Sequence, residues 1–138
     1  MIKLMFWNSR GLRNKISELH DYINKEKLLV VGVNETFLTD SVTLPPLKDF
    51  EYIRIDKSNH SGGLLLIIHK SIVFNVIDLP QTDLFECLAL KIKINNNRSF
   101  LLVLVYCQGS LEISLLCSYS QQFVVMDDSN AGQLLGIA

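Results

Sequence analysis

The sequence predicts an α/β fold, and three observations favour that class. Two apolar runs, at residues 2–7 and 28–34, enclose a segment whose apolar residues recur every three to four positions, the spacing of an amphipathic helix. Beyond residue 50 the chain changes to short apolar runs separated by polar turns, which is typical of strands. A last apolar run at residues 122–126 follows a stretch without a clear pattern. At 138 residues the chain has the length of one domain.

The first elements form a strand–helix–strand unit. Residues 2–7, IKLMFW, are apolar at nearly every position, which predicts a strand covered on both faces. Residues 28–34, LLVVGVN, predict a second strand of the same kind. A helical connection of about a dozen residues favours a parallel pair, because antiparallel neighbours need only a short turn. The apolar stripe of the helix, which ends near residues 25–27, consists of Leu12, Ile16, Leu19, Tyr22 and Ile23.

The rest of the chain is predicted to form an antiparallel meander followed by a return strand. Pro45 and Pro46 place residues 38–50 in a long loop. Residues 110–121 fit either a weak helix or a loop, and no strand is predicted after residue 126. Polar turns at 58–63 and 95–98 interrupt the strands, which are predicted at residues 52–55, 64–69, 72–77, 85–94, 100–106 and 122–126.

The amino-acid composition limits the cellular environment and the binding partners to be expected for this chain. A net charge of -1 and a pI of about 6.3 exclude a dominant basic surface of the kind that defines many nucleic-acid-binding proteins. The three cysteines include no CxxC pair, which favours reduced thiols inside a cell. No apolar stretch reaches the ~20 residues that cross a bilayer, and the N-terminal run is too short for a signal peptide. We expect a soluble intracellular chain without a membrane partner, with the nucleus as one open alternative.

Polar side chains follow three of the predicted strands abruptly. Asn8 and Glu35 come after the two parallel strands, and Asp128 and Asn130 come after the last one. Parallel strands bring Asn8 and Glu35 to the same end of the sheet, where ligands of α/β proteins bind. An oxygen-rich cluster of this kind suits Mg²⁺, which in turn suits phosphate ester chemistry.

Simpler interpretations of these residues stay open. Asn8 could cap the following helix, Glu35 could be a solvated strand end, and Asp128 and Asn130 could be turn residues. The cations of the first loop and helix start, Arg10, Arg13 and Lys15, could contact backbone phosphates or could form a solvated helix face.

Five segments taken together carry a family resemblance. They are FWNSRGLRNKI at 6–16, VVGVNETFL at 30–38, SGGLLLIIHKSI at 61–72, LVLVY at 102–106 and VVMDDSNA at 124–131. In this order they resemble the endonuclease/exonuclease/phosphatase superfamily, and above all the apurinic-type endonuclease domain at the start of non-long-terminal-repeat retrotransposon polyproteins. The resemblance covers essentially the whole chain.

The resemblance implies a four-layer α/β sandwich of two mixed sheets flanked by helices, and phosphodiester cleavage of DNA dependent on Mg²⁺ or Mn²⁺. It implies no small-molecule cofactor. Asn8 matches the residue that orients the phosphate and metal, and Glu35 matches the metal ligand. Tyr106 matches the residue that contacts the scissile phosphate. Asp128 and Asn130 match the residues that position the attacking water and stabilise the transition state.

The sequence departs from the family pattern at several places. Asn34 replaces the usual glutamine before the metal ligand, Asp127 replaces a glycine, and residues 107–109 replace Arg-Pro-Pro. The connection between Tyr106 and Asp128 is shorter than usual, and the family's C-terminal Asp-His pair has no counterpart. We therefore expect one truncated domain over residues 1–138, with the C-terminal half of the sandwich absent and no activity by itself. The alternatives are a degenerate non-catalytic remnant, or a phosphatase- or sphingomyelinase-like hydrolase of the same superfamily.

Overall fold

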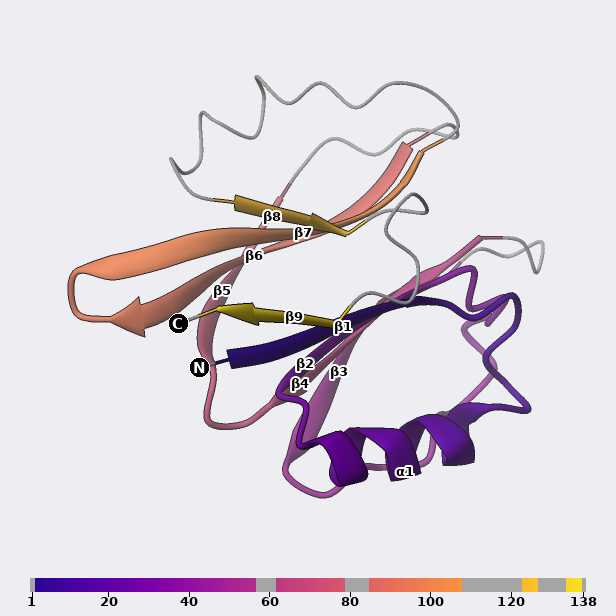
Figure 1. Cartoon of the computed structure of the whole chain (residues 1–138). Helices are drawn as coiled ribbons and strands as arrows, with labels where there is room; N and C mark the ends of the chain where they lie inside the picture. Colours follow the sequence, from indigo (N-terminus) through magenta and orange to yellow (C-terminus); the bar gives the residue numbers. More distant parts are fainter. Residues whose placement is uncertain (1, 57–61, 79–84, 108–122, 127–133, 138) are drawn as a thin grey trace.

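The computed structural model describes residues 2–56, 62–78, 85–107, 123–126 and 134–137. Its secondary structure confirms the α/β class, with strands in the majority (Figure 1). Within the described ranges no helix combines the length and the apolar character needed to cross a bilayer. The elements are β1 (Ile2–Asn8), α1 (Ile16–Glu26), β2 (Val30–Asn34), β3 (Phe50–Ile55), β4 (Leu64–His69), β5 (Val73–Ile77), β6 (Phe85–Asn95), β7 (Arg98–Cys107), β8 (Phe123–Met126) and β9 (Leu134–Ile137).

The strands form two mixed sheets. The first sheet has the order β3-β4-β2-β1-β9, and the second has the order β5-β6-β7-β8. As predicted, β1 and β2 are parallel, with Leu4 opposite Val30 and Asn8 opposite Asn34. The predicted meander is divided between the sheets, because β3 and β4 join β2 in the first sheet whereas β5, β6 and β7 build the second. The return strand β8 lies parallel to β7.

The structure corrects the prediction that no strand follows residue 126. Strand β9 pairs antiparallel with β1, with Ile2 opposite Ile137 and Met5 opposite Leu134. The outer edge of β1 presents backbone groups that need partners, and a short apolar segment satisfies them. Residues 110–121, predicted as a weak helix or a loop, lie outside the described residues.

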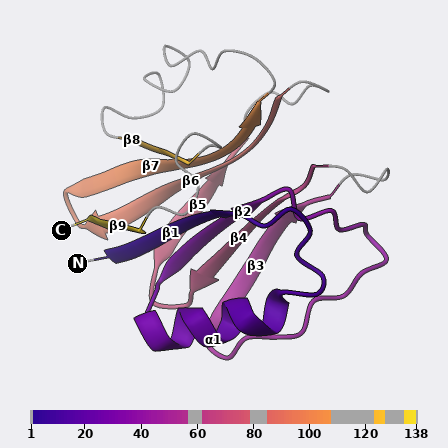
Figure 2. The same cartoon turned by 45° about the vertical axis from the view of Figure 1, so that its right-hand side comes forward.

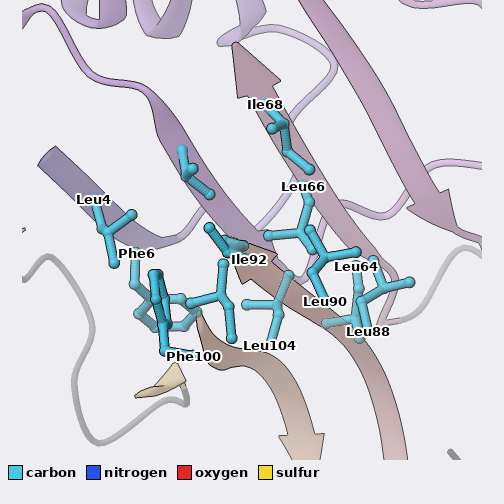
Figure 3. Packing of buried hydrophobic residues seen from close by; sticks show 12 residues of the cluster. Leu4, Phe6, Leu64, Leu66, Ile68, Leu88, Leu90, Ile92, Phe100 and Leu104 are labelled. Carbon is cyan, nitrogen blue, oxygen red and sulfur yellow. The ribbon is translucent and has the colours of Figure 1, made fainter. Parts of the chain in front are cut away.

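The main core lies between the two sheets. Alternate residues of the first sheet face alternate residues of the second, so that the leucine, isoleucine and phenylalanine side chains interdigitate (Figure 3). Full burial of one such side chain contributes about 1.5–3 kcal/mol. The buried members of this core are Leu4, Phe6, Val30, Leu64, Leu66, Ile68, Leu88, Leu90, Ile92, Phe100, Leu102 and Leu104.

A second core lies between the first sheet and α1, which covers the outer face of that sheet (Figure 2). Leu19 and Ile23 of the helix pack there against Val31, Val33 and Met5. The helix starts later than its apolar stripe suggested, so Leu12 belongs to the preceding loop, although it is fully buried. Among the described residues the layers are therefore helix, sheet and sheet, which is part of the four-layer sandwich that the resemblance implied.

Candidate functional site

The carboxyl ends of β1 and β2 form the centre of the candidate site. Asn8 and Asn34 are the last paired residues of these parallel strands, and Glu35 follows directly. The structure therefore brings Asn8 and Glu35 to one edge of the first sheet, as the parallel pairing requires. Asn34 is fully buried, whereas Asn8 and Glu35 are partly exposed.

Backbone hydrogen bonds fix the position of Glu35. Glu35 adopts a left-handed backbone conformation with φ of 49°. Its carbonyl accepts hydrogen bonds from the Gly11 amide at 2.8 Å and the Ser9 hydroxyl at 3.0 Å. The Ser9 amide also donates to the Asn34 carbonyl at 3.1 Å. The loop after β1 is thus bonded to the loop after β2. These contacts give the backbone of Glu35 a defined position at the end of β2.

The interpretation of Asn8 as a helix cap is wrong. Helix α1 begins at Ile16, its N-cap residue is Lys15, and that residue makes no side-chain capping bond. The Asn8 side chain instead accepts a hydrogen bond from the Arg10 amide, with 3.2 Å between Oδ1 and N. This bond closes a tight turn immediately after β1, which holds the amide group at the edge of the sheet beside β2.

The start of β4 lies at the same edge, because β4 runs antiparallel to β2 and Leu64 pairs with Asn34. The carbonyls of Gly62 and Gly63 accept bonds from the amides of Phe37 and Thr36 at 3.0 and 3.4 Å. Gly63 has φ of +96°, and a Cβ there would lie 2.3 Å from the Thr36 Oγ1. Glycine is required at this position for both reasons.

Glu86 is a site residue that the sequence analysis missed. It lies near the start of β6 with only 3% of its surface exposed, and its Oε2 accepts a bond from the Gly63 amide at 3.3 Å. This bond joins the second sheet to the first at the edge where Asn8 and Glu35 lie. A signal for it existed, because Glu86 has the same alternation phase as Leu88 and Leu90 and therefore faces the core.

Tyr106 reaches this edge from the second sheet. It is the strand partner of Glu86, it is partly buried, and it packs against the core between the sheets. Asn8 and Glu35 therefore lie at one end of the first sheet, and Tyr106 lies in the second sheet opposite Glu86, whose carboxylate bonds to Gly63 of the first sheet. Their chemical roles remain predictions.

The predicted residues Asp128 and Asn130 lie outside the described residues. The strand before them, β8, runs parallel to β7, and its last residue Met126 pairs with Leu104. Since Leu104 precedes Tyr106 by two positions on β7, β8 points toward the same edge of the second sheet. The proposed roles of Asp128 and Asn130 stay predictions.

Arg10 and Arg13 are both exposed on the loop that follows β1. Lys15 is more enclosed, because its ammonium donates to the Ser9 carbonyl and lies 5.9 Å from the centre of the Trp7 ring. The lysine therefore supports the loop, whereas the two arginines are accessible to an anionic ligand. Phosphate contact by Arg10 and Arg13 stays a prediction.

Buried polar side chains concentrate at this edge. In the part of the chain that the structure describes, the buried polar residues are Ser9, Asn34, Thr36 and Glu86. Ser9 follows β1, Asn34 ends β2, Thr36 lies in the loop after β2, and Glu86 is the second residue of β6. Because burying polar groups costs free energy unless they are hydrogen-bonded, their clustering marks a position selected for more than packing.

The available donors fit a hard cation. Asn8 and Glu35, both partly exposed, offer an amide and a carboxylate oxygen, and Mg²⁺ commonly takes one or two carboxylates and completes its shell with water and phosphate. No group of three or more His, Cys, Asp or Glu residues that could hold a metal occurs within the described ranges. Oxygen donors of this kind suit Mg²⁺ better than zinc, which prefers histidine and cysteine.

Two mixed sheets packed face to face, with α1 over the outer face of the first, define the class of fold. The chain has the endonuclease/exonuclease/phosphatase fold, as comparison with solved structures shows. This finding confirms the resemblance at the level of the fold. No family model matches the sequence, and no curated protein does.

Three solved structures illustrate the similarity. The AP endonuclease LMAP from Leishmania major has 19% identity and a TM-score of 0.59, over 84% of this chain and 43% of that protein. The endonuclease domain of TRAS1, a telomere-specific non-LTR retrotransposon, has 13% identity and a TM-score of 0.60, over 96% of this chain and 61% of that domain. The 3′ phosphatase NExo from Neisseria, bound to a product DNA hairpin, has 13% identity and a TM-score of 0.52, over 78% of this chain and 42% of that protein. The chain thus spans between two fifths and two thirds of the length of these proteins.

Proposed function

We propose that this chain provides part of a Mg²⁺-dependent phosphodiesterase site that acts on DNA and derives from a retrotransposon endonuclease. The observation that carries the proposal is the backbone network that fixes Glu35 beside Asn8, at the carboxyl ends of two parallel strands. The fold likeness to an AP endonuclease and to a retrotransposon endonuclease domain supports it. The same chemistry suits Mn²⁺, which prefers the same oxygen ligands.

Each residue has a role that its chemistry allows. Glu35 would hold the cation, and the Asn8 amide would orient the phosphate beside it. The Tyr106 hydroxyl would donate to a phosphate oxygen, and donors of this kind stabilise negative charge that develops in the transition state. Asp128 would position the attacking water and Asn130 would stabilise the transition state. The bound cation would neutralise charge on the phosphoryl oxygens.

We further propose that the chain by itself binds the cation without cleaving DNA. Of the described histidines, His69 ends β4 at the end opposite Gly63, and His20 is bonded to the Tyr52 hydroxyl at 2.8 Å. Neither lies at the edge that holds Glu35. The resemblance implies a catalytic histidine, and His20 and His69 both lie away from this edge, whereas His60 lies outside the described residues.

The test compares Glu35→Gln with Glu51→Gln, which removes an exposed carboxylate from β3 and serves as the matched control. Mg²⁺ should raise the melting temperature of the parent chain and of Glu51→Gln, but not that of Glu35→Gln. We expect that the parent chain and both variants leave DNA that contains an abasic site uncut. If Mg²⁺ still raises the melting temperature of Glu35→Gln, Glu35 does not hold the cation. If the parent chain nicks DNA and Glu35→Gln does not, the proposed inactivity is refuted. No shift in any of the three proteins would favour a degenerate remnant.

A phosphatase is the second candidate, because one of the similar structures is described as a 3′ phosphatase. Release of phosphate from a DNA end that carries a 3′-phosphate distinguishes it from an endonuclease. Mg²⁺-dependent release that is lost in Glu35→Gln, without strand nicking, would support this candidate.

A further inference from the structure

A second polar hollow lies on the second sheet, at the β6–β7 hairpin, which extends to the left in Figure 1. Its volume is about 280 Å³, and its lining includes the cations Lys91, Lys93 and Arg98. No carboxylate occurs among the described residues that line it. In a chain whose net charge is -1, three cations without an opposing carboxylate form a local concentration of positive charge.

The register of the strands explains why these cations lie together. Lys91 and Lys93 are two positions apart on β6, so they lie on the same face, about 7 Å apart along the strand. Both are exposed, and the strand partner of Lys93 is Ser99, the neighbour of the exposed Arg98 on β7. The described acidic residues of this sheet lie toward its other end, since Asp78 follows β5 and Glu86 begins β6. Neither of these two described carboxylates therefore lies beside the cations of the hollow.

The other lining groups indicate the kind of partner. Amides of Asn75, Asn95 and Asn97 and the hydroxyl of Ser99 surround the cations. Lysine, arginine, asparagine and serine are the side chains that bind the phosphates and sugars of nucleic acids without reading their sequence. Successive charges of one strand lie about 3.4 Å apart along the axis of a duplex, so the spacing of the two lysines covers about two phosphates.

We propose that this hollow is a second nucleic-acid-binding surface, which holds the phosphate backbone independently of sequence and of metal. It is separate from the candidate site, because Lys93 lies seven positions beyond Glu86 on β6, or about 24 Å along the strand. A nucleic acid bound at the hairpin would tether the chain without occupying Asn8 or Glu35. The inference therefore does not depend on the phosphodiesterase function.

The test measures binding of a fluorescein-labelled DNA duplex to the full chain by anisotropy, in EDTA so that no divalent cation takes part. The double variant Lys91→Gln/Lys93→Gln removes two cations from the hollow. The matched control, Lys25→Gln/Lys48→Gln, removes two exposed lysines from the part of the chain around the first sheet. We expect the hollow variant to bind roughly tenfold more weakly at ~0.1 M salt, and its slope of log affinity against log salt to be smaller by about two.

The remaining arms separate this inference from the function proposed above. Glu35→Gln should bind DNA in EDTA as the parent chain does, whatever its effect on Mg²⁺. Equal weakening in the two lysine pairs would overturn the proposal, because bulk charge would then explain binding. Undetectable binding of the parent chain at low salt would also overturn it. A third result would overturn the proposal as well. In it, the chain binds vesicles of phosphatidylserine and phosphatidylcholine through Lys91 and Lys93, whereas its binding to DNA does not depend on these lysines.

Discussion

The Glu86 carboxylate in the second sheet accepts a hydrogen bond from the backbone amide of Gly63 in the first, with 3.3 Å between Oε2 and the nitrogen. Gly63 in turn accepts a bond from the Thr36 amide, and Thr36 directly follows Glu35. A short series of contacts therefore leads from the second sheet to the proposed metal ligand. The relative position of the two sheets and the position of Glu35 are linked at this point.

Replacement of Glu86 tests that link. Glu86→Ala leaves the buried Gly63 amide without its acceptor, which should lower the free energy of unfolding by about 1–3 kcal/mol. Glu86→Gln keeps an acceptor oxygen in a side chain of nearly the same shape, so its free energy of unfolding should fall by less. Urea denaturation of the two variants measures the difference. Equal stability of the two variants would show that the hydrogen bond contributes little.

Gly63→Ala should destabilise the chain through two separable effects. The backbone at φ of +96° is strained for any residue with a Cβ, and the new methyl group would collide with Thr36 Oγ1 at 2.3 Å. We expect a loss of at least about 2 kcal/mol in the free energy of unfolding. The double variant Gly63→Ala/Thr36→Ala should recover the steric part only, and Thr36→Ala alone completes the thermodynamic cycle. Full recovery in the double variant would mean that backbone strain is negligible.

Asn8→Asp places a second carboxylate beside the position of Glu35. The new side chain keeps an acceptor for the Arg10 amide, so the turn after β1 should survive. Affinity for Mg²⁺ should rise by about an order of magnitude, because ligand charge tunes binding of hard cations. Isothermal titration calorimetry measures the change, with Asn8→Ala as the comparison that removes the oxygen. An unchanged affinity in Asn8→Asp would place residue 8 away from the cation.

Acidification should destabilise the chain through His20. Burial lowers the pKa of His20 below its ordinary value of 6.5, and the nearby Asp21 carboxylate opposes part of that shift. The unfolded chain therefore binds a proton more readily than the folded chain, so stability is full above pH 6.5 and falls as the pH drops below it. The Tyr52 hydroxyl donates its one proton to the Pro45 carbonyl. Its oxygen therefore accepts from His20, whose Nε2 carries the proton in this hydrogen bond.

The measurement is the urea midpoint as a function of pH, from about pH 8 to pH 5. His20→Gln can keep a donor toward Tyr52 but does not titrate. The urea midpoint of this variant should therefore fall less steeply as the pH is lowered. His69→Gln is the control, since the described hydrogen bond of the His69 side chain is to the exposed Ser71. An identical pH dependence in His20→Gln and the parent chain would refute the role of His20.

Much of the fold could be predicted because its signals are local. The apolar runs of β1 and β2 and the helical spacing between them define a parallel pair, and parallel pairing alone places Asn8 beside Glu35. The division of strands between two sheets could not be predicted in this way. Only residues 70–72 separate β4 from β5, a length typical of a hairpin, yet β4 pairs with β2 and β3 instead.

The parts that were missed depend on contacts between distant residues. Strand β9 has four residues, too few for a periodic pattern, and its partner β1 lies at the other end of the sequence. Glu86 was missed because its charge suggested exposure, although its phase on β6 suggested burial. A carboxylate can occupy such an inward position only when a donor meets it, and that donor is the amide of Gly63.

The pairing of β1 with β9 also bears on how the chain folds during its synthesis. Residues 2–5 leave the ribosome long before their partners, residues 134–137. Contacts across such a separation require closure of a very long loop and slow the folding reaction. Throughout that interval one edge of β1 lacks its neighbour, and an exposed edge can pair with another chain. Chaperone dependence and aggregation of nascent chains should therefore centre on this strand.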